Sequence, residues 1–205
     1  MKKTLLSVIL GTALLLPTAQ ATELTYDYVG VGYTKIAVDE SALNPDGFII
    51  KGSKLFSERV FATLSYASTS SNITFLGERL SYDLNETRVS LGYRFPMAAK
   101  TDLYGELGYL NWDSKVTFAG SGDYLGFSSK NSFDAATFKV GVKHLLGQSF
   151  ETDLYIDHQQ SSSEGSITLL GVNAAYRLTT QFHLVAGIAL ESDYKRYHIG
   201  VNYAF

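Results

Sequence analysis

The sequence of 205 residues predicts an all-β fold, and three observations lead to that prediction. Large apolar residues alternate with small or polar ones along most of the chain after residue 21, which is the period of a β-strand. No helical period of 3.6 residues occurs over the same stretch at a useful length. The composition combines 14 Tyr and 12 Phe with 18 Gly at a mean hydropathy of +0.02. A soluble domain of this size rarely needs so many tyrosines.

The first 21 residues have the features of an export signal. Two lysines precede an apolar stretch from Leu5 to Leu16, and the small-residue run Ala19-Gln20-Ala21 follows it. A charged start, an apolar stretch of about 7–15 residues and an A-x-A end are the parts of a secretory signal peptide. We therefore predict a signal peptide over residues 1–21, cleavage before Thr22 and one β domain over residues 22–205. An uncleaved anchor is disfavoured because the apolar stretch is short.

The composition excludes several classes of function. The absence of cysteine rules out disulfides, zinc–thiolate sites, iron–sulfur clusters and cysteine nucleophiles. With 17 basic and 20 acidic residues the net charge is -3, which gives no electrostatic case for a nucleic-acid partner. No run of about 20 apolar residues is present, so no membrane-spanning helix is predicted.

Ten segments carry the strand period, and their connections alternate in length. In the first, Val29, Val31 and Tyr33 alternate with two glycines and a threonine, and comparable alternation returns along the chain to Ile199, Val201 and Tyr203 in the last. Tight turns near residues 57–59, 96–101, 146–150 and 179–181 alternate with longer loops, the longest at about 114–133. This one-sided loop pattern with an even strand number is typical of an outer-membrane barrel. The segments are 26–38, 47–56, 60–68, 80–95, 102–113, 134–145, 151–160, 166–178, 182–191 and 195–205.

Three features favour a membrane barrel over a soluble β-sandwich, whose two faces would alternate in the same way. Tyrosines recur near the strand ends on the apolar face, as interfacial girdles require. The opposite face carries charges in mid-strand, and the chain stops at Phe205 with aromatic or β-branched residues at alternate positions before it. We therefore predict a transmembrane, antiparallel, up-and-down β-barrel. The predicted aromatic girdle consists of Tyr33, Tyr66, Tyr93, Tyr109, Tyr176 and Tyr197.

Several segments resemble a known family. The ending Tyr197-His198-Ile199-Gly200-Val201-Asn202-Tyr203-Ala204-Phe205 is similar to the C-terminal assembly signal of bacterial outer-membrane proteins. The segments Val29 to Tyr33, Ser90 to Phe95 and Leu103 to Tyr109 resemble strands of the small outer-membrane β-barrel family (OmpA/OmpX-like). The resemblance implies residence in the outer membrane of a Gram-negative bacterium and an assembly machinery that recognises Tyr203 and Phe205. Its members of this length usually have eight strands, so eight is the alternative to the ten predicted here.

Charged residues on the inward phase predict a mixed network inside the barrel. Counting back from the turn at 146–150 brings Lys139 near Asp157 and Lys143 near Asp153, and the turn at 96–101 brings Glu106 near Arg88. Charges withdrawn from bulk water must pair, so we expect a plugged, salt-bridged interior. A narrow, water-filled pore is the alternative, because barrel diameter grows with strand number. The predicted network is Lys51, Arg88, Glu106, Lys139, Lys143, Asp153 and Asp157.

The histidines do not form a recognisable catalytic or metal set. Asp157 and His158 are adjacent, so their side chains point to opposite faces of a strand. His183 and His198 face inward on neighbouring strands, and two histidines are a weak metal site even with Glu191 in the same region. No nucleophile elbow, P-loop or paired-carboxylate motif occurs. We predict no enzymatic activity, no cofactor and no metal, with a lipid-modifying enzyme as the alternative from that class.

The long loop is the other candidate for function. It carries Phe118, Tyr124 and Phe127 among hydroxyl and glycine residues. Apolar residues in a loop indicate either a hairpin extension above the membrane or a contact surface for another molecule. We prefer the extension and keep a surface contact, as in adhesion, as the alternative.

The combined prediction is a monomeric, integral outer-membrane β-barrel protein with a structural or cell-surface interaction role. Its partners would be outer-membrane lipid, lipopolysaccharide and the outer-membrane assembly machinery, with no nucleic acid. A small-solute pore is the first alternative function.

Overall fold

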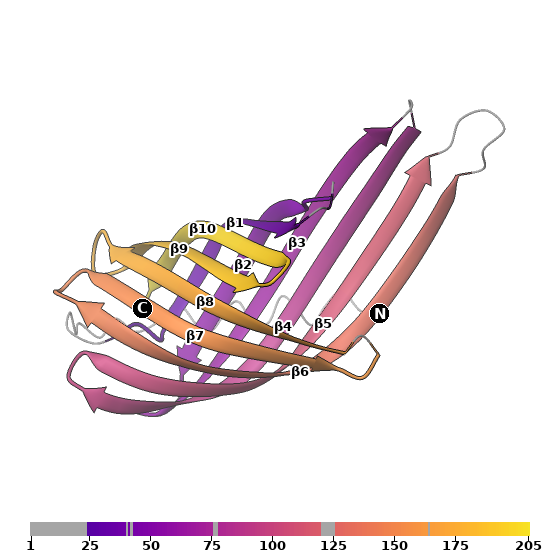
Figure 1. The fold of residues 1–205 in the computed structure, drawn as a ribbon. Helices are drawn as coiled ribbons and strands as arrows, with labels where there is room; N and C mark the ends of the chain where they lie inside the picture. The colour runs from indigo at the N-terminus through magenta and orange to yellow at the C-terminus, as the bar shows by residue number, and fades with distance from the viewer. Residues whose placement is uncertain (1–23, 40, 42, 76–77, 120–125, 164) are drawn as a thin grey trace, which may run out of the picture.

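Ten antiparallel strands close into a barrel in the computed structural model, which describes residues 24–39, 41, 43–75, 78–119, 126–163 and 165–205 (Figure 1). Each strand pairs with the next along the chain, and the first pairs with the last. The ten-strand prediction is confirmed and the eight-strand alternative is wrong. Among the described residues, no helix is long and apolar enough to cross a membrane. The strands are β1 (Tyr28–Val38), β2 (Asp46–Leu55), β3 (Val60–Phe75), β4 (Glu78–Ala98), β5 (Thr101–Ala119), β6 (Phe127–Leu146), β7 (Phe150–Ser161), β8 (Gly165–Arg177), β9 (Phe182–Glu191) and β10 (Tyr194–Ala204).

The wall of the barrel has an apolar outside and a polar inside. Along β1, Val29, Val31 and Tyr33 are exposed while Gly30 and Thr34 are buried. The same phase holds around the barrel, so most exposed large apolar side chains lie on its outer surface. In a membrane this surface meets lipid and the inner surface encloses the lumen.

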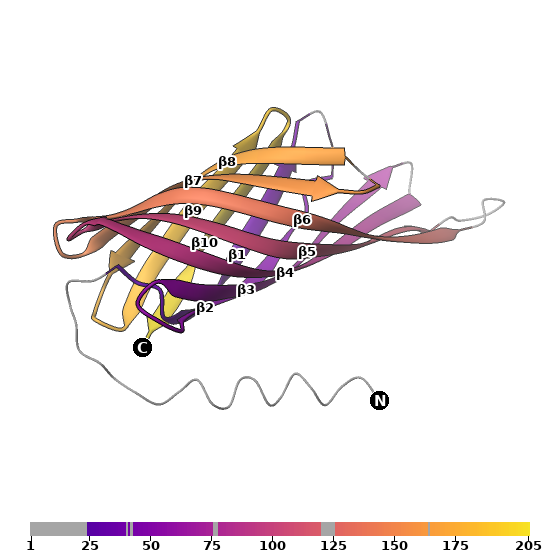
Figure 2. The same ribbon diagram turned by 90° about the horizontal axis from the view of Figure 1, so that it is seen from below.

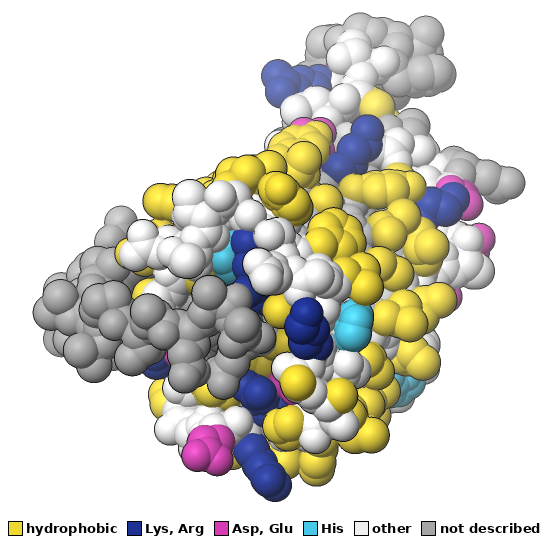
Figure 3. All heavy atoms as spheres, turned by 90° about the vertical axis from the view of Figure 1, so that its left-hand side faces the viewer, with side chains coloured by type: hydrophobic (Ala, Val, Ile, Leu, Met, Phe, Trp, Pro, Cys, Tyr) yellow, Lys and Arg dark blue, Asp and Glu magenta, His cyan; other side chains and the backbone are white. Residues whose placement is uncertain are grey.

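The two ends of the barrel differ. Short turns and the C-terminus lie at the left-hand end in Figure 1, which we call the turn end, and the longer connections lie at the other, the loop end. Gly147 has a φ of 66° in the turn between β6 and β7, a conformation that favours glycine. Figure 3 looks onto the turn end, where Lys and Arg side chains gather while hydrophobic side chains cover much of the wall behind them. In barrels of this type the short turns are periplasmic and the loops extracellular.

Strands β3 to β6 extend past the other six at the loop end. β2 stops pairing at Asp46 opposite Ser70, and β7 pairs with β6 only from Ala135 onward. Beyond these points the four strands continue as a sheet, and the β5–β6 hairpin reaches furthest in both ribbon views (Figures 1 and 2). At this end the predicted strands for β3 and β5 stop too early and the one for β6 begins too late, whereas the one for β4 begins within two residues of the observed start. The predicted loop 114–133 is mostly strand, and its strand-forming residues end at Ala119 and resume at Phe127.

The seam between β1 and β10 closes the barrel and is rich in glycine. Gly32 lies opposite Gly200, and a Cβ built on Gly32 would come within 2.4 Å of the Ile199 carbonyl oxygen. Side chains are excluded there because the two backbones approach closely. The seam thus joins the two ends of the chain through backbone pairing.

Candidate functional site

Among the described residues, five ion pairs in the lumen tie its walls together. Two pairs join strands that are not neighbours: Arg88 of β4 reaches Asp157 of β7 at 2.7 Å, and Arg196 of β10 reaches Glu86 of β4. All five carboxylates are buried. Burying such charges costs free energy unless they are paired, and pairs across a lumen also fix the distance between opposite walls. The remaining pairs are Arg94–Asp102, Lys139–Glu106 and Arg177–Glu151.

The predicted network lies inside the barrel, but its pairing differs from the register argument. Lys139 is opposite Asp157, and Lys143 is opposite Asp153, as expected. The nearest carboxylate of Lys139 is nevertheless Glu106, at 3.6 Å, while Asp157 binds Arg88. The expected proximity of Glu106 to Arg88 is wrong, because the turn at residues 99–100 sets Glu106 opposite Gly92 and Arg88 opposite Leu110.

Several lumenal charges were missed from the sequence. Glu86 is two residues before Arg88 on the same inward phase, so its phase alone could have identified it. It also accepts a hydrogen bond of 2.7 Å from the Trp112 indole nitrogen. Its partner Arg196 is on the opposite wall, and hairpin register predicts only neighbouring strands. Arg94, Asp102 and Glu151 were missed as well, whereas Arg177 and Arg196 were placed on the inward face from sequence but not in the network.

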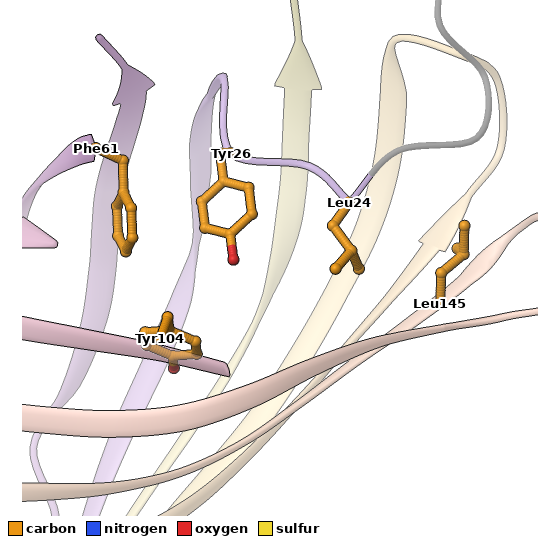
Figure 4. Packing of buried hydrophobic residues seen from close by; sticks show 5 residues of the cluster. All are labelled: Leu24, Tyr26, Phe61, Tyr104 and Leu145. Carbon is orange, nitrogen blue, oxygen red and sulfur yellow. The ribbon is translucent and has the colours of Figure 1, made fainter. Parts of the chain in front are cut away.

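The segment before β1 folds into the turn end of the lumen. We call residues Leu24–Asp27 the strap. Leu24 and Tyr26 are 8% and 3% exposed and pack with Phe61 of β3, Tyr104 of β5 and Leu145 of β6 (Figure 4). The ring centroids of Tyr26 and Phe61 are 4.9 Å apart. Residues 26 and 27 of the strap fall within the predicted first strand, 26–38, whereas the observed β1 begins at Tyr28.

Polar contacts hold the strap in place. The Thr25 hydroxyl donates to Glu151 Oε1 at 2.6 Å, and Lys143 Nζ donates to the Thr25 carbonyl at 3.2 Å. Lys143 and Arg94 also lie over the Tyr26 ring, at 4.3 and 4.9 Å from its centroid. Burial, with a contribution from the nearby Asp102 carboxylate, raises the pKa of the Tyr26 phenol, so this side chain stays neutral.

Described residues of the lumen line two adjoining cavities. The larger, of about 160 Å³, is lined by residues from all ten strands. The smaller, of about 90 Å³, includes Thr25 of the strap in its lining. Both have room for several water molecules. Six side chains line both cavities, which places the cavities next to each other: Tyr28, Lys51, Lys143, Asp153, Asn173 and His198.

Lys51 and Lys143 differ from the other lumenal cations. Neither has a carboxylate within 4.0 Å among the described residues. Lys143 binds the strap instead, whereas Lys51 Nζ contacts His198 Nε2 at 3.3 Å. Asp153, the expected partner of Lys143, accepts hydrogen bonds from the Tyr104 hydroxyl and the Asn173 amide.

The residues predicted for the aromatic girdle lie on the outer surface of the barrel, and those predicted for the C-terminal assembly signal lie at its turn end. The six girdle tyrosines are each exposed on the outward phase: Tyr33, Tyr66, Tyr93, Tyr109, Tyr176 and Tyr197. Tyr203 pairs with Val29 across the seam, and its ring packs edge-on against Phe182 at 5.4 Å. The Phe205 amide donates to the Asp27 carbonyl, which links the C-terminus to the strap.

The predicted loop contacts lie in the extension formed by β3 to β6. Phe118 and Phe127 are opposite one another on β5 and β6, with their rings stacked at 5.7 Å. Both lie in the strands of a hairpin extension, which is the preferred reading of this segment from the sequence. Tyr124 lies outside the described residues, as does the predicted signal peptide, residues 1–21.

The described histidines are not assembled into a catalytic set. His183 is opposite Asn202 and His198 is opposite Gly187, so the register offsets the two histidines along neighbouring strands. His158 points outward and contacts the Thr168 hydroxyl at 2.9 Å. No group of three His, Cys, Asp or Glu residues arranged to hold a metal ion occurs within the described ranges.

The chain is similar in sequence and in fold to known proteins. A sequence model of the outer membrane protein beta-barrel domain matches residues 6–205. No curated protein matches. Among solved structures, the β domain of the Bordetella autotransporter BrkA is 13% identical, with 89% of this chain and 100% of that chain covered and a TM-score of 0.52.

Two further solved structures have similar coverage. The attachment invasion locus protein Ail of Yersinia pestis is 18% identical, covers 87% of this chain and 97% of its own, and has a TM-score of 0.46. OprG of Pseudomonas aeruginosa is 12% identical, covers 91% and 99%, and has a TM-score of 0.46. The family match spans nearly the whole chain and agrees with the apolar outer wall. The chain therefore belongs to the outer membrane protein beta-barrel domain family and is an integral protein of the bacterial outer membrane, in contact with its lipid.

Proposed function

We propose that this chain is a monomeric cell-surface interaction protein with a plugged lumen, and that the extension formed by β3 to β6 is its contact element. One observation carries the proposal. The extension has an apolar face that neither lipid nor an opposite wall of the barrel covers, because the other six strands end at or below its base.

The polarity of the strands inverts where the extension begins. Inward-phase residues of the extension are mainly apolar, although the same phase is polar inside the barrel. Outward-phase residues there are polar or charged, although the same phase is apolar in the membrane. The apolar face comprises Ile73, Leu80, Tyr82, Val116, Phe118 and Phe127, and the polar face includes Asn72, Arg79, Asp83, Lys115 and Lys130.

The edges of the extension add a second recognition feature. Residues 71–75 of β3 and 127–134 of β6 each pair with a strand on one side only. Unpaired backbone groups on a strand edge can receive a strand from another molecule, and an adjacent apolar face can select its side chains. An exposed apolar surface rimmed by polar groups is the usual mark of a protein contact.

The extension can be tested with matched variants on its two faces. We expect Tyr82→Ser, Phe118→Ser and Phe127→Ser together to reduce attachment of expressing bacteria to cultured host cells. The matched control replaces Arg79, Lys115 and Lys130 with Ser on the opposite face and should retain attachment. Antibody labelling of whole cells measures display of each variant. Equal attachment by both variants and the parent would refute the surface-contact role.

A narrow pore is the second candidate, and the two lumenal cavities favour it. Two features oppose an open path through the barrel. The strap fills the turn end of the lumen, and the Glu86–Arg196 pair crosses the lumen toward the loop end. Single-channel recordings of refolded protein in planar bilayers distinguish the two. The plugged barrel predicts no steady conductance, and a stable open level in the parent protein would favour the pore.

We also propose that the chain is not an enzyme. Six described carboxylates of the lumen are engaged by arginine, lysine, tyrosine or asparagine, and the described histidines lack a catalytic arrangement: these are Glu86, Asp102, Glu106, Glu151, Asp153 and Asp157. The lipid A profile of overexpressing cells tests this proposal, and a modified lipid species dependent on the protein would contradict it.

A further inference from the structure

We propose that the lumen holds a small inorganic anion at Lys51, in a chamber closed toward the periplasm by the strap. Seven cationic side chains among the described residues point into the lumen, and five of them have a carboxylate within 4.0 Å. The sixth, Lys143, is opposite Asp153 in register and binds the strap.

Lys51 is the described lumenal cation that has no carboxylate within 4.0 Å and none opposite it in register. Its neighbours in register are Gly30 on β1 and Ser65 on β3, and both are neutral. Its contact with His198 uses one of the three N–H donors of an ammonium group. A buried charge requires an opposite charge or strong hydration. Because Lys51 lines both cavities, there is space beside it for either.

The smaller cavity also contains polar atoms without a protein partner. His183 is 2% exposed, and its Nε2 has no hydrogen-bond partner among the described residues. The Asn173 Oδ1 atom is likewise buried and unpartnered, and both side chains line this cavity. Buried polar atoms of this kind are satisfied by ordered guests. We infer that water occupies the acceptor side of the chamber and solvates an anion held by Lys51.

The strap explains how such an ion would be retained. Thr25 forms part of the wall of the smaller cavity, and the apolar side chains of Leu24 and Tyr26 lie at the turn end of the lumen. Its anchors, Glu151 and Lys143, line the same cavity. Displacing the strap would connect the chamber with the periplasm, so strap opening would control exchange of the ion.

Binding is tested first by stability in different salts. Refolded protein in detergent micelles is unfolded by denaturant in sodium chloride and in sodium gluconate of equal ionic strength, since gluconate is much bulkier than chloride and coordinates cations weakly. At chloride ten times its Kd, the folding equilibrium constant should rise about tenfold. Lys51→Met should abolish this increase, whereas Lys130→Met, on the exposed extension, should retain it. The same chloride dependence in Lys51→Met as in the parent would overturn the proposal.

Bromide soaking provides a test that needs no variant. Crystals of the parent protein soaked in sodium bromide should show an anomalous peak in the lumen within contact of Lys51 Nζ. A lumen without such a peak, together with unfolding that does not distinguish chloride from gluconate, would show that water alone solvates Lys51.

Exchange tests the strap separately from the site. Chloride bound behind a closed strap exchanges slowly and leaves the 35Cl NMR line of the bulk ion narrow. In the double variant Leu24→Ser and Tyr26→Ser, fast exchange should broaden that line, and adding Lys51→Met should remove the broadening. Equal broadening in the parent and the double variant would eliminate the strap as the closure while leaving the anion site intact.

Discussion

Strands β3 to β6 pass through two environments, the membrane and the extension above it. Apolar and polar side chains alternate in both, but the apolar side chains point outward in the membrane half and inward in the extension. In the membrane half, Leu91 and Leu107 point outward to lipid while Glu86 and Glu106 point into the lumen. In the extension, Phe118 takes the inward phase and charged residues take the outward one. The comparison teaches that strand phase fixes which side a residue faces, whereas the solvent on that side decides which residue is tolerated there.

Removing a lumenal charge should have the largest effect. Glu86 and Asp83 are three residues apart on β4 and face opposite sides. Glu86→Gln leaves Arg196 buried without its carboxylate and should lower the free energy of unfolding by about 3–5 kcal/mol. The matched change Asp83→Asn, opposite Lys115 on the polar face of the extension, should alter it by less than about 0.5 kcal/mol. Denaturant unfolding, followed by the fluorescence of Trp112, which binds Glu86, measures the change in free energy of unfolding for each variant. Equal changes in the two variants would show that the lumen is as hydrated as the surface.

A lysine placed on the outward face should have the second largest effect, and the loss in free energy of unfolding should differ between the membrane half and the extension. Leu107 is 67% exposed in the middle of the membrane half of β5, and Thr117 has the same outward phase near the end of β5. Leu107→Lys should cost about 2–4 kcal/mol in lipid vesicles, and Thr117→Lys about 0–1 kcal/mol. A comparable cost at both positions would place the extension within the bilayer.

Truncating an aromatic side chain of the extension should have the smallest effect. Phe118→Ala removes the stacked pair with Phe127, worth about 1 kcal/mol, from a sheet that is open on both sides. We expect trypsin to cleave after Lys115 or Lys130 about fivefold faster, because local opening is favoured, with no change in global unfolding. Thr117→Ala, on the other face, serves as the control. If Phe118→Ala instead lowered the free energy of global unfolding by the same amount, the extension would unfold together with the barrel and not by itself.

The ten strands and their two faces could be predicted because period two survives in every strand, including at Val29, Val31 and Tyr33. The upper ends of β3, β5 and β6 could not, although the upper end of β4 was predicted to within two residues. There Ile73, Phe118 and Phe127 continue the alternation with inverted polarity, which a search for one polarity pattern reads as a loop.

The sequence shows which charged residues face the lumen, but not which of them form ion pairs with one another. Lys139 and Asp157 face inward by phase alone, and hairpin register correctly placed them opposite each other. The contacts that they make depend on barrel curvature and strand tilt, which bring Arg88 to Asp157 across two intervening strands. The strap escaped prediction because Tyr26 continues the alternation of β1, and no local property of the sequence shows that the chain turns inward there.

The closing seam has a consequence for the order of assembly. Every other strand pair joins neighbours in sequence, whereas β1 and β10 bring together the two ends of the domain. The entropy lost in closing so long a loop makes this pair the slowest to form. The strap, whose partners lie on β3 to β7 and whose Asp27 carbonyl receives the Phe205 amide, acquires its full set of contacts only in a closed ring. Its docking therefore marks the completion of folding, and burial of Tyr26 should be the last event to appear in a refolding time course.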